Sequence, residues 1–171
     1  MAKEKLDQDA IHFRPARPED AKAASRLMFE TFPQKATFVI GLGDKDRAQR
    51  ILRRLFAMPD HRLSYTETEM ALYQGSIVGL ITAFPGRKMG KLDRRLDLLI
   101  LKQYSFRGKI AVIQRGWPLI FIKETTRMEY FISNLAVKKR YRSKGLGEQL
   151  ISRIEADAMA ANLDRVSLMV A

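Results

Sequence analysis

The sequence predicts an α/β (α+β) fold in which a mixed, mostly antiparallel sheet is flanked by helices. Two strand-length apolar runs surround Gln74 and Gly75, a pattern typical of an antiparallel β-hairpin. Residues 44–58 carry apolar side chains at helical spacing, and residues 128–137 form a long strand-like run that leads into another helical pattern. Strands and helices in this order indicate a sheet with helices packed against it.

The composition suggests a single globular domain. The chain has 171 residues, of which 46% are hydrophobic, and this is enough to form a core. We expect residues 1–10 to be a disordered N-terminal segment and residues 11–171 to form one domain, because no repeat or linker divides them. The N-terminal segment is polar and no apolar run approaches the roughly 20 residues that span a bilayer, so we expect a cytoplasmic protein without a membrane partner.

The residue types present exclude several kinds of chemistry. The chain contains no cysteine, which excludes disulfides, thiolate metal sites and an acyl-cysteine intermediate. The histidines, His12 and His61, lie far apart in the sequence, and we expect structural or surface roles for both and no metal site. The formal net charge of +12 favours an anionic partner.

The first half of the chain is expected to supply three strands and two helices. The segment "IHFRPARPED" reads as a short strand followed by the start of a helix. Pro18 suits the first helical position, and the helix is expected to run to about Phe32. Asp44 can cap a second helix, which Pro59 ends, and the arginines of this helix are expected on its solvated side. The hairpin strands are expected at residues 68–73 and 76–84.

Residues 86–127 are expected to form an insertion between the third and fourth strands. Pro85 and Gly86 end the hairpin, and a helix is predicted near residues 91–104. The apolar run 117–122 fits either the core or a hydrophobic substrate wall, and packing in the core is the favoured interpretation.

The fourth strand and the helix after it are the clearest elements of the second half. The apolar alternation in residues 128–137 changes phase near Asn134, which predicts a β-bulge. A helix with an apolar face follows, and Asn162 is expected to end it in a left-handed conformation. Residues 165–171 begin a fifth strand.

The loop between this strand and this helix predicts an anion site. A strand that feeds a tight loop at a helix start directs several backbone N–H groups, and the positive end of the helix dipole, towards one point. Gly145 and Gly147 let a diphosphate approach the backbone, Arg142 and Lys144 can screen its charge, and Leu146 packs inward. The spacing fits neither a P-loop nor the dinucleotide-binding glycine motif.

The sequence "LAVKKRYRSKGLGEQLI" resembles the coenzyme A diphosphate site of the GNAT acyltransferase superfamily, which carries RxxGxG after a strand. The resemblance covers the chain from about Ile11 to its end, because the expected order of strands and helices also matches that fold. It implies that backbone N–H groups bind the diphosphate at Arg142, Ser143, Lys144, Gly145, Leu146, Gly147 and Glu148. It further implies that pantetheine pairs like an extra strand with Leu135, Ala136 and Val137. The thioester would then lie beside residues 134–137, where Asn134 begins the stretch and the N–H of Ala136 or Val137 would polarise its carbonyl.

The reaction implied by the resemblance is acyl-CoA-dependent N-acylation, in which acetyl-CoA donates an acetyl group to the primary amine of a small molecule or a protein. Without cysteine, direct attack in a ternary complex is favoured. The amine must lose a proton before it attacks, and Glu129 at the start of the long strand is the candidate base, with Ser133 and Asn134 as polar lining. Glu67 and Glu69 are reserve candidates.

Members of this superfamily continue past the fifth strand into a helix, which often carries a tyrosine that protonates the leaving thiolate, and two more strands. We therefore expect a longer chain, a homodimer or a second chain to complete the sheet, and we do not expect this length of chain to be a competent enzyme by itself. No general acid is assigned.

Two other functions stay open at this point. A basic nucleic-acid-binding module would suit the net charge, but the basic residues are spread over several elements without grouped stacking aromatics. A third possibility is a catalytically silent protein that binds acyl-CoA without turnover, and nothing in the sequence excludes it.

Overall fold

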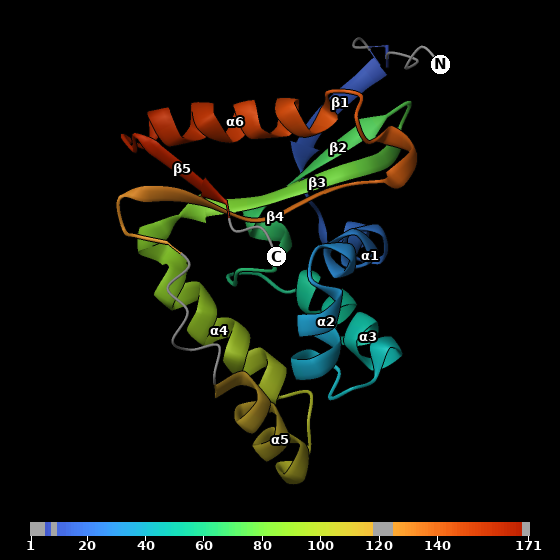
Figure 1. Ribbon diagram of the computed structural model, residues 1–171, viewed down its shortest axis with the longest axis vertical. Coiled ribbons are helices and arrows are strands. Elements are labelled where there is room, and N and C mark those ends of the chain that lie inside the picture. Colours follow the sequence, from blue (N-terminus) through green and yellow to red (C-terminus); the bar gives the residue numbers. More distant parts are fainter. Residues whose placement is uncertain (1–5, 8–9, 118–124, 169–171) are drawn as a thin grey trace.

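The structure, a computed structural model, describes residues 6–7, 10–117 and 125–168 and places them around one five-stranded sheet (Figure 1). The strands lie in chain order, as β1 (Ile11–Pro15), β2 (Thr68–Tyr73), β3 (Ser76–Pro85), β4 (Glu129–Val137) and β5 (Arg165–Leu168). The first four pair antiparallel, and β5 pairs parallel with β4. The expected mixed, mostly antiparallel sheet is confirmed.

Helices cover both faces of the sheet. The helices are α1 (Ala21–Thr31), α2 (Pro33–Lys35), α3 (Lys45–Phe56), α4 (Met89–Leu101), α5 (Phe106–Gly116) and α6 (Leu146–Ala160), and a π-helical turn (Ala36–Ile40) follows α2. Figure 1 shows α6 on one face, α1 and α3 on the other, and the α4–α5 pair extending away from the sheet.

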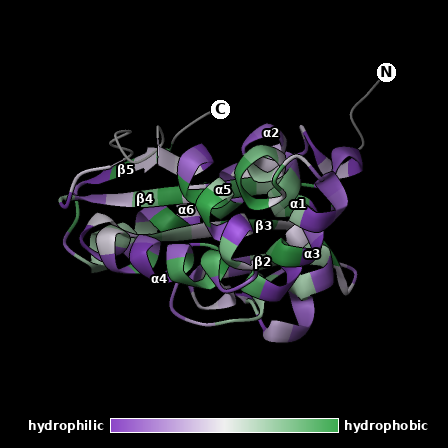
Figure 2. Ribbon diagram, turned by 90° about the horizontal axis from the view of Figure 1, so that it is seen from below, coloured by the Kyte–Doolittle hydropathy of each residue, from purple (hydrophilic) through white to green (hydrophobic). Residues whose placement is uncertain are grey.

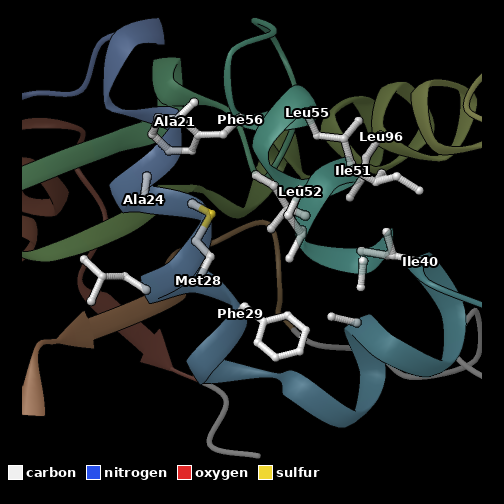
Figure 3. Close-up of a cluster of buried hydrophobic side chains, with 14 of the residues drawn as sticks. Ala21, Ala24, Met28, Phe29, Ile40, Ile51, Leu52, Leu55, Phe56 and Leu96 are labelled. Carbon is white, nitrogen blue, oxygen red and sulfur yellow. The ribbon is translucent and has the colours of Figure 1, made fainter. Parts of the chain in front are cut away.

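The helix α3 forms where its cap and its apolar spacing predict it. The Asp44 side chain accepts a hydrogen bond from the Arg47 N–H at 2.9 Å, which satisfies a free donor of the first turn. Leu52 and Phe56 are buried in one cluster with Ala21 and Met28 of α1 (Figure 3). The same cluster includes Leu80 of the sheet. This face of the sheet is therefore sealed by α1 and α3.

The opposite face is covered by α6. Its residues Leu146, Leu150 and Ile154 are buried in one cluster with Ile81 and Ile132 of the sheet. The expected left-handed residue at its end is present, since Asn162 has φ 55°.

The β4 strand contains the expected bulge. Thr82 of β3 lies opposite Asn134, whereas the neighbouring Ala83 lies opposite Ile132. Ser133 is thus the extra residue, and a bulged residue bends the strand and increases its local twist.

The insertion contains a helix that the sequence did not predict. The helix expected near residues 91–104 is α4, which buries Leu92, Leu96 and Ile100. A second helix, α5, follows, and Gly108 within it had weakened the helical pattern. Trp117, at the start of the run expected in the core, is 59% exposed, and residues 118–122 lie outside the described residues.

The N-terminal segment is not wholly as expected. Leu6 is 7% exposed and packs in the cluster with Ile11, while residues 1–5 and 8–9 lie outside the described residues. The last three residues of the expected fifth strand, 169–171, are also outside them. Within the described ranges, no helix combines the length and the apolar character needed to cross a bilayer.

Candidate active site

The loop before α6 forms a cradle of open backbone amides. Ser143 and Gly145 take left-handed conformations with φ 58° and 83°, which turn the backbone tightly into the helix. Within the described part of the chain, no group accepts a hydrogen bond from the N–H groups of residues 143–148. Unsatisfied N–H groups at a helix start favour an anion.

The glycines of this loop leave room for a ligand. A Cβ added at Gly145 or Gly147 would meet no atom within 4 Å, so neither glycine is needed for close packing against other described residues. Leu146 between them is 1% exposed and anchors the loop to the core. The surface outside the amide cradle is therefore accessible.

Next to this cradle, β4 has an open edge. Its pairing with β5 runs from Glu129 only as far as Ile132, so in the described residues the strand beyond the bulge pairs on one side alone. The Lys138 N–H donates to the Val78 carbonyl at 2.8 Å, so the backbone hydrogen-bonding groups of Lys138 face β3. By the alternation of a strand, Leu135 and Val137 direct their N–H and C=O groups to the open edge, and Ala136 directs its groups to β3.

The Arg142 side chain lies across this edge. Its Nε donates to the Val137 carbonyl at 2.8 Å, and a terminal nitrogen donates to a carboxylate oxygen of Glu30 at 2.8 Å. Both side chains are about half exposed, and exposed ion pairs contribute little stability. A ligand that offers Arg142 a better anion can displace it.

Polar side chains from three other elements hold the bulge. Asn134 is 2% exposed; its Oδ1 lies 2.9 Å from the Thr31 hydroxyl of α1, and its Nδ2 donates to the Ser133 hydroxyl at 3.2 Å. Arg62, which precedes β2, donates to the same Ser133 hydroxyl at 3.3 Å and to Asp93 of α4 at 3.2 Å. Sequence reasoning named Ser133 and Asn134 as polar lining but missed Thr31, Arg62 and Asp93.

Glu129, the candidate base, lies apart from this arrangement. Its backbone lies opposite that of Arg165 in the register of β4 and β5, at the end of this strand pair farther from the bulge. Its carboxylate accepts hydrogen bonds from the Thr126 N–H at 3.1 Å and the Thr125 hydroxyl at 3.0 Å, and these bonds lower the pKa of Glu129. A lowered pKa makes a carboxylate a weaker base, which disfavours this role.

The reserve carboxylates are also engaged. Glu69 accepts a hydrogen bond from Arg153 of α6 at 2.8 Å and so belongs to the α6 side of the sheet. Glu67 accepts from Lys88 at 3.4 Å. The ion pair with Arg153 disfavours Glu69 as the base, whereas the long contact with an exposed lysine holds Glu67 only weakly, so Glu67 stays a reserve candidate.

The histidines have the structural and surface positions expected of them. The His61 side chain is fully buried, with Nε2 at 2.9 Å from the Leu55 carbonyl and Nδ1 accepting from the Leu63 N–H at 3.3 Å. His12 is exposed on β1. Among the described residues, no three His, Asp or Glu side chains lie together in a way that could hold a metal ion.

The sequence matches the family model described as "Acetyltransferase (GNAT) family" over residues 24–171. The chain belongs to the GNAT acetyltransferase family. This result confirms the resemblance inferred from the glycine loop and establishes the chain as a GNAT-type N-acetyltransferase. Acetyl-CoA, the cofactor expected from the sequence, is consistent with this family.

Solved structures of acetyltransferases share the GNAT fold of this chain. One acetyltransferase has a TM-score of 0.69 at 19% identity, covering 89% of this chain and 76% of its own. An N-acetyltransferase from Staphylococcus aureus Mu50 has a TM-score of 0.69 at 21% identity, with 85% and 75% covered. An aminoglycoside N-acetyltransferase in complex with CoA has a TM-score of 0.53 at 10% identity, with 94% and 77% covered. No curated protein matches the chain significantly.

Proposed function

We propose that this GNAT protein transfers an acetyl group from acetyl-CoA to the primary amine of a small molecule, by direct attack within a ternary complex. The observation that carries the proposal is that an open amide cradle at the start of α6 lies next to an open strand edge at Leu135 and Val137. Together they offer binding groups for a diphosphate and for an extended amide-containing arm.

The cofactor would enter in an extended form along β4. Its diphosphate would accept hydrogen bonds from the N–H groups of residues 143–148, and the pantetheine amides would pair with Leu135 and Val137. Arg142 would leave the Val137 carbonyl and move towards the diphosphate, because a phosphate is a stronger partner than an exposed carboxylate or a carbonyl.

The thioester carbonyl would then lie near the bulge. Of the two amides expected to polarise it, Val137 directs its N–H to the open edge and Ala136 does not, and Leu135 shares the orientation of Val137. An N–H group aimed at the developing oxyanion contributes about 3 kcal/mol to transition-state stabilisation in enzymes where it has been removed.

A small-molecule acceptor is supported by the aminoglycoside N-acetyltransferase, which shares the fold over 94% of this chain. The acceptor would approach on the side of the bulge that carries Ser133, Arg62 and Asp93. With no cysteine in the chain, no acyl-enzyme on sulfur can form, and the amine would attack the thioester directly.

Substitutions at Gly147 test the cofactor site without straining the backbone. Gly147 lies in the first turn of α6, has open space around its Cβ, and does not have a positive φ. In Gly147→Glu the added carboxylate would repel the diphosphate and lower acetyl-CoA affinity by at least about tenfold, while the helix itself gains from a negative charge near its N-terminus. Gly147→Gln, equal in size but neutral, is the matched control and should lose much less affinity.

The measurement is isothermal titration with acetyl-CoA, combined with thermal melting of the free proteins. Turnover is followed by release of free CoA thiol across a panel of small amines, and the absence of cysteine removes any background from the protein. Equal affinities for all three proteins would contradict the site. Tight binding by the wild type without turnover on any amine would contradict acetyl transfer by this chain alone. That result would fit either a silent acyl-CoA-binding protein or a chain that needs a partner to complete the sheet.

A further inference from the structure

The helix α5 exposes its more apolar face to solvent. Four large side chains share this face, with exposed fractions of 42–78%, and are called here the α5 stripe: Phe106, Ile110, Ile113 and Trp117. At about 100° per residue they fall within about 60° of one another around the helix axis. Surface helices normally turn such a stripe towards the core, so this orientation needs a reason.

Within the described residues, the opposite face of α5 packs on the rest of the protein through one buried apolar residue and through polar contacts. Val112 is the buried residue of the helix, and Arg115 donates to the Phe38 carbonyl at 3.0 Å while stacking on the Phe38 ring at 4.9 Å. Gly108 packs against Tyr104, whose hydroxyl donates to the Ile40 carbonyl. Among the described residues, the α5 stripe is therefore the more exposed side of the helix.

Charge on α5 is of one sign. The helix carries Arg107, Lys109 and Arg115 and no acidic residue. Arg107 and Lys109 are exposed and flank the α5 stripe on its two sides, since they lie about 100° and about 60° from Phe106 in opposite directions. An apolar stripe with one cation on each side matches a lipid surface, whose interior is apolar and whose headgroups are anionic.

We propose that α5 docks on an anionic lipid bilayer, with the α5 stripe inserted at the level of the headgroups and Arg107 and Lys109 on lipid phosphates. Long cationic side chains can place their stems along apolar material and their charges at the boundary, and tryptophan favours that boundary. Figure 1 places α5 at the end of the molecule farthest from the sheet, and Figure 2 shows apolar residues of α5 when that end is viewed. This position lets a flat surface reach the stripe.

A second copy of the chain is a poorer occupant. Pairing the stripe with itself would bring the cations of one α5 close to those of the other, with no carboxylate on either helix to offset them. The sequence predicted no membrane partner because it lacks a spanning segment, but docking on a surface does not need one. The net charge of +12 adds long-range attraction to an anionic surface.

The single tryptophan of the chain makes the proposal directly measurable, because Trp117 lies in the stripe. Vesicles of phosphatidylcholine alone, or with about a third phosphatidylserine, are titrated into the full chain while Trp117 emission is recorded. We expect a blue shift and co-flotation with the anionic vesicles only. No shift with anionic vesicles would overturn the proposal.

Two matched pairs of variants separate the stripe from general charge. Ile110→Ser with Ile113→Ser keeps Trp117 and should weaken partitioning at least about tenfold, whereas Met159→Ser, at an exposed methionine on α6, should not. Arg107→Gln with Lys109→Gln should weaken it about tenfold or more, while Arg94→Gln with Arg95→Gln removes equal charge from α4 and should change it less. Equal losses within either pair contradict the proposal.

Measurements without lipid test whether the chain itself or a second copy of it covers the α5 stripe. If Trp117 is already protected from acrylamide in the free monomer, the chain itself covers the stripe and the proposal fails. If sedimentation shows a dimer that Ile110→Ser with Ile113→Ser dissociates, the stripe is an interface between copies, and the proposal again fails. Circular dichroism of every variant confirms that α5 and the rest of the fold remain.

Discussion

His61 shows how one buried side chain makes stability depend on pH. Its Nδ1 accepts from the Leu63 N–H, so the neutral ring with a proton on Nε2 fits the site, and a second proton would break that bond. Burial is the main reason that the pKa of His61 lies below its ordinary value of 6.5. The folded protein therefore binds fewer protons than the unfolded chain when the pH falls below about 6.5.

The sign of the effect follows from this difference. Stability supplied by neutral His61 is fully present above pH 6.5 and declines below it, by at most about 1.4 kcal/mol per pH unit, until the lowered pKa is passed. We expect urea unfolding to show this decline between pH 7 and pH 5. His12→Gln, which removes the exposed histidine, should leave the decline intact. Unfolding free energy that is flat over this range would refute the prediction.

The residues around the bulge show what a single sequence can and cannot reveal at this scale. Asn134 was identified because the apolar alternation breaks there, and this signal is local. Thr31 and Arg62 could not be found in this way, because they are 103 and 71 residues away from their partners in β4. Only the packing of α1 and of the segment before β2 on the sheet brings them to the bulge.

At the level of elements, α1 supports β4 through one hydroxyl. The Thr31 hydroxyl contacts the Met28 carbonyl within its own helix and the buried Asn134 amide on the strand. Thr31→Val keeps the shape of the side chain but removes this contact, and a buried polar group without a partner costs about 1–3 kcal/mol. We expect that loss in unfolding free energy, together with a lower kcat, because the bulge orients the amides of the open edge.

A conservative variant distinguishes the hydroxyl from general packing. Thr31→Ser retains the hydrogen bond and should keep most of the kcat that Thr31→Val loses. Titration with acetyl-CoA should give nearly unchanged affinity for both variants, because the diphosphate cradle at residues 143–148 is formed by other residues. If Thr31→Ser and Thr31→Val lose kcat equally, the hydroxyl does not position the strand.

Elements whose signals are local were predicted well, and α5 is the main exception. The cap of α3 and its periodic apolar face are encoded within a few residues, and both are present. Reading an apolar pattern assumes that its apolar side faces the core, as it does in α6. In α5 that side faces outward, so the pattern carried no information about how the helix packs.

For the whole molecule, the topology of the sheet brings the parts of the candidate site together. Because β4 lies between β3 and β5 and extends beyond the described part of β5, one strand carries both the bulge and, among the described residues, the open edge. The sequence predicted this strand, its loop and the cofactor class, since they are contiguous. The proposed acceptor side is formed by α1, α4 and the segment before β2, which come together only in the complete fold.

The net charge of +12 should also act on the cofactor, and two pairs of lysine and arginine substitutions separate its general effect from a local one. Lys138 and Lys139 are exposed beside the amide cradle, and Lys91 and Arg94 are exposed on α4. Removing either pair lowers the net charge equally, so long-range attraction to anionic acetyl-CoA should weaken equally. Of the two pairs, Lys138 and Lys139 precede the amide cradle in the chain, and in the proposed site they would contact a phosphate of the cofactor.

We therefore expect Lys138→Gln with Lys139→Gln to weaken acetyl-CoA binding about threefold to tenfold at an ionic strength of roughly 0.15 M, where the Debye length is about 8 Å. Lys91→Gln with Arg94→Gln should lose much less affinity at that ionic strength. Its loss should approach that of the Lys138 and Lys139 variant only at low salt. Titration of both double variants across a salt series measures this. Parallel losses at every salt concentration would mean that the lysines act through net charge alone and touch no phosphate.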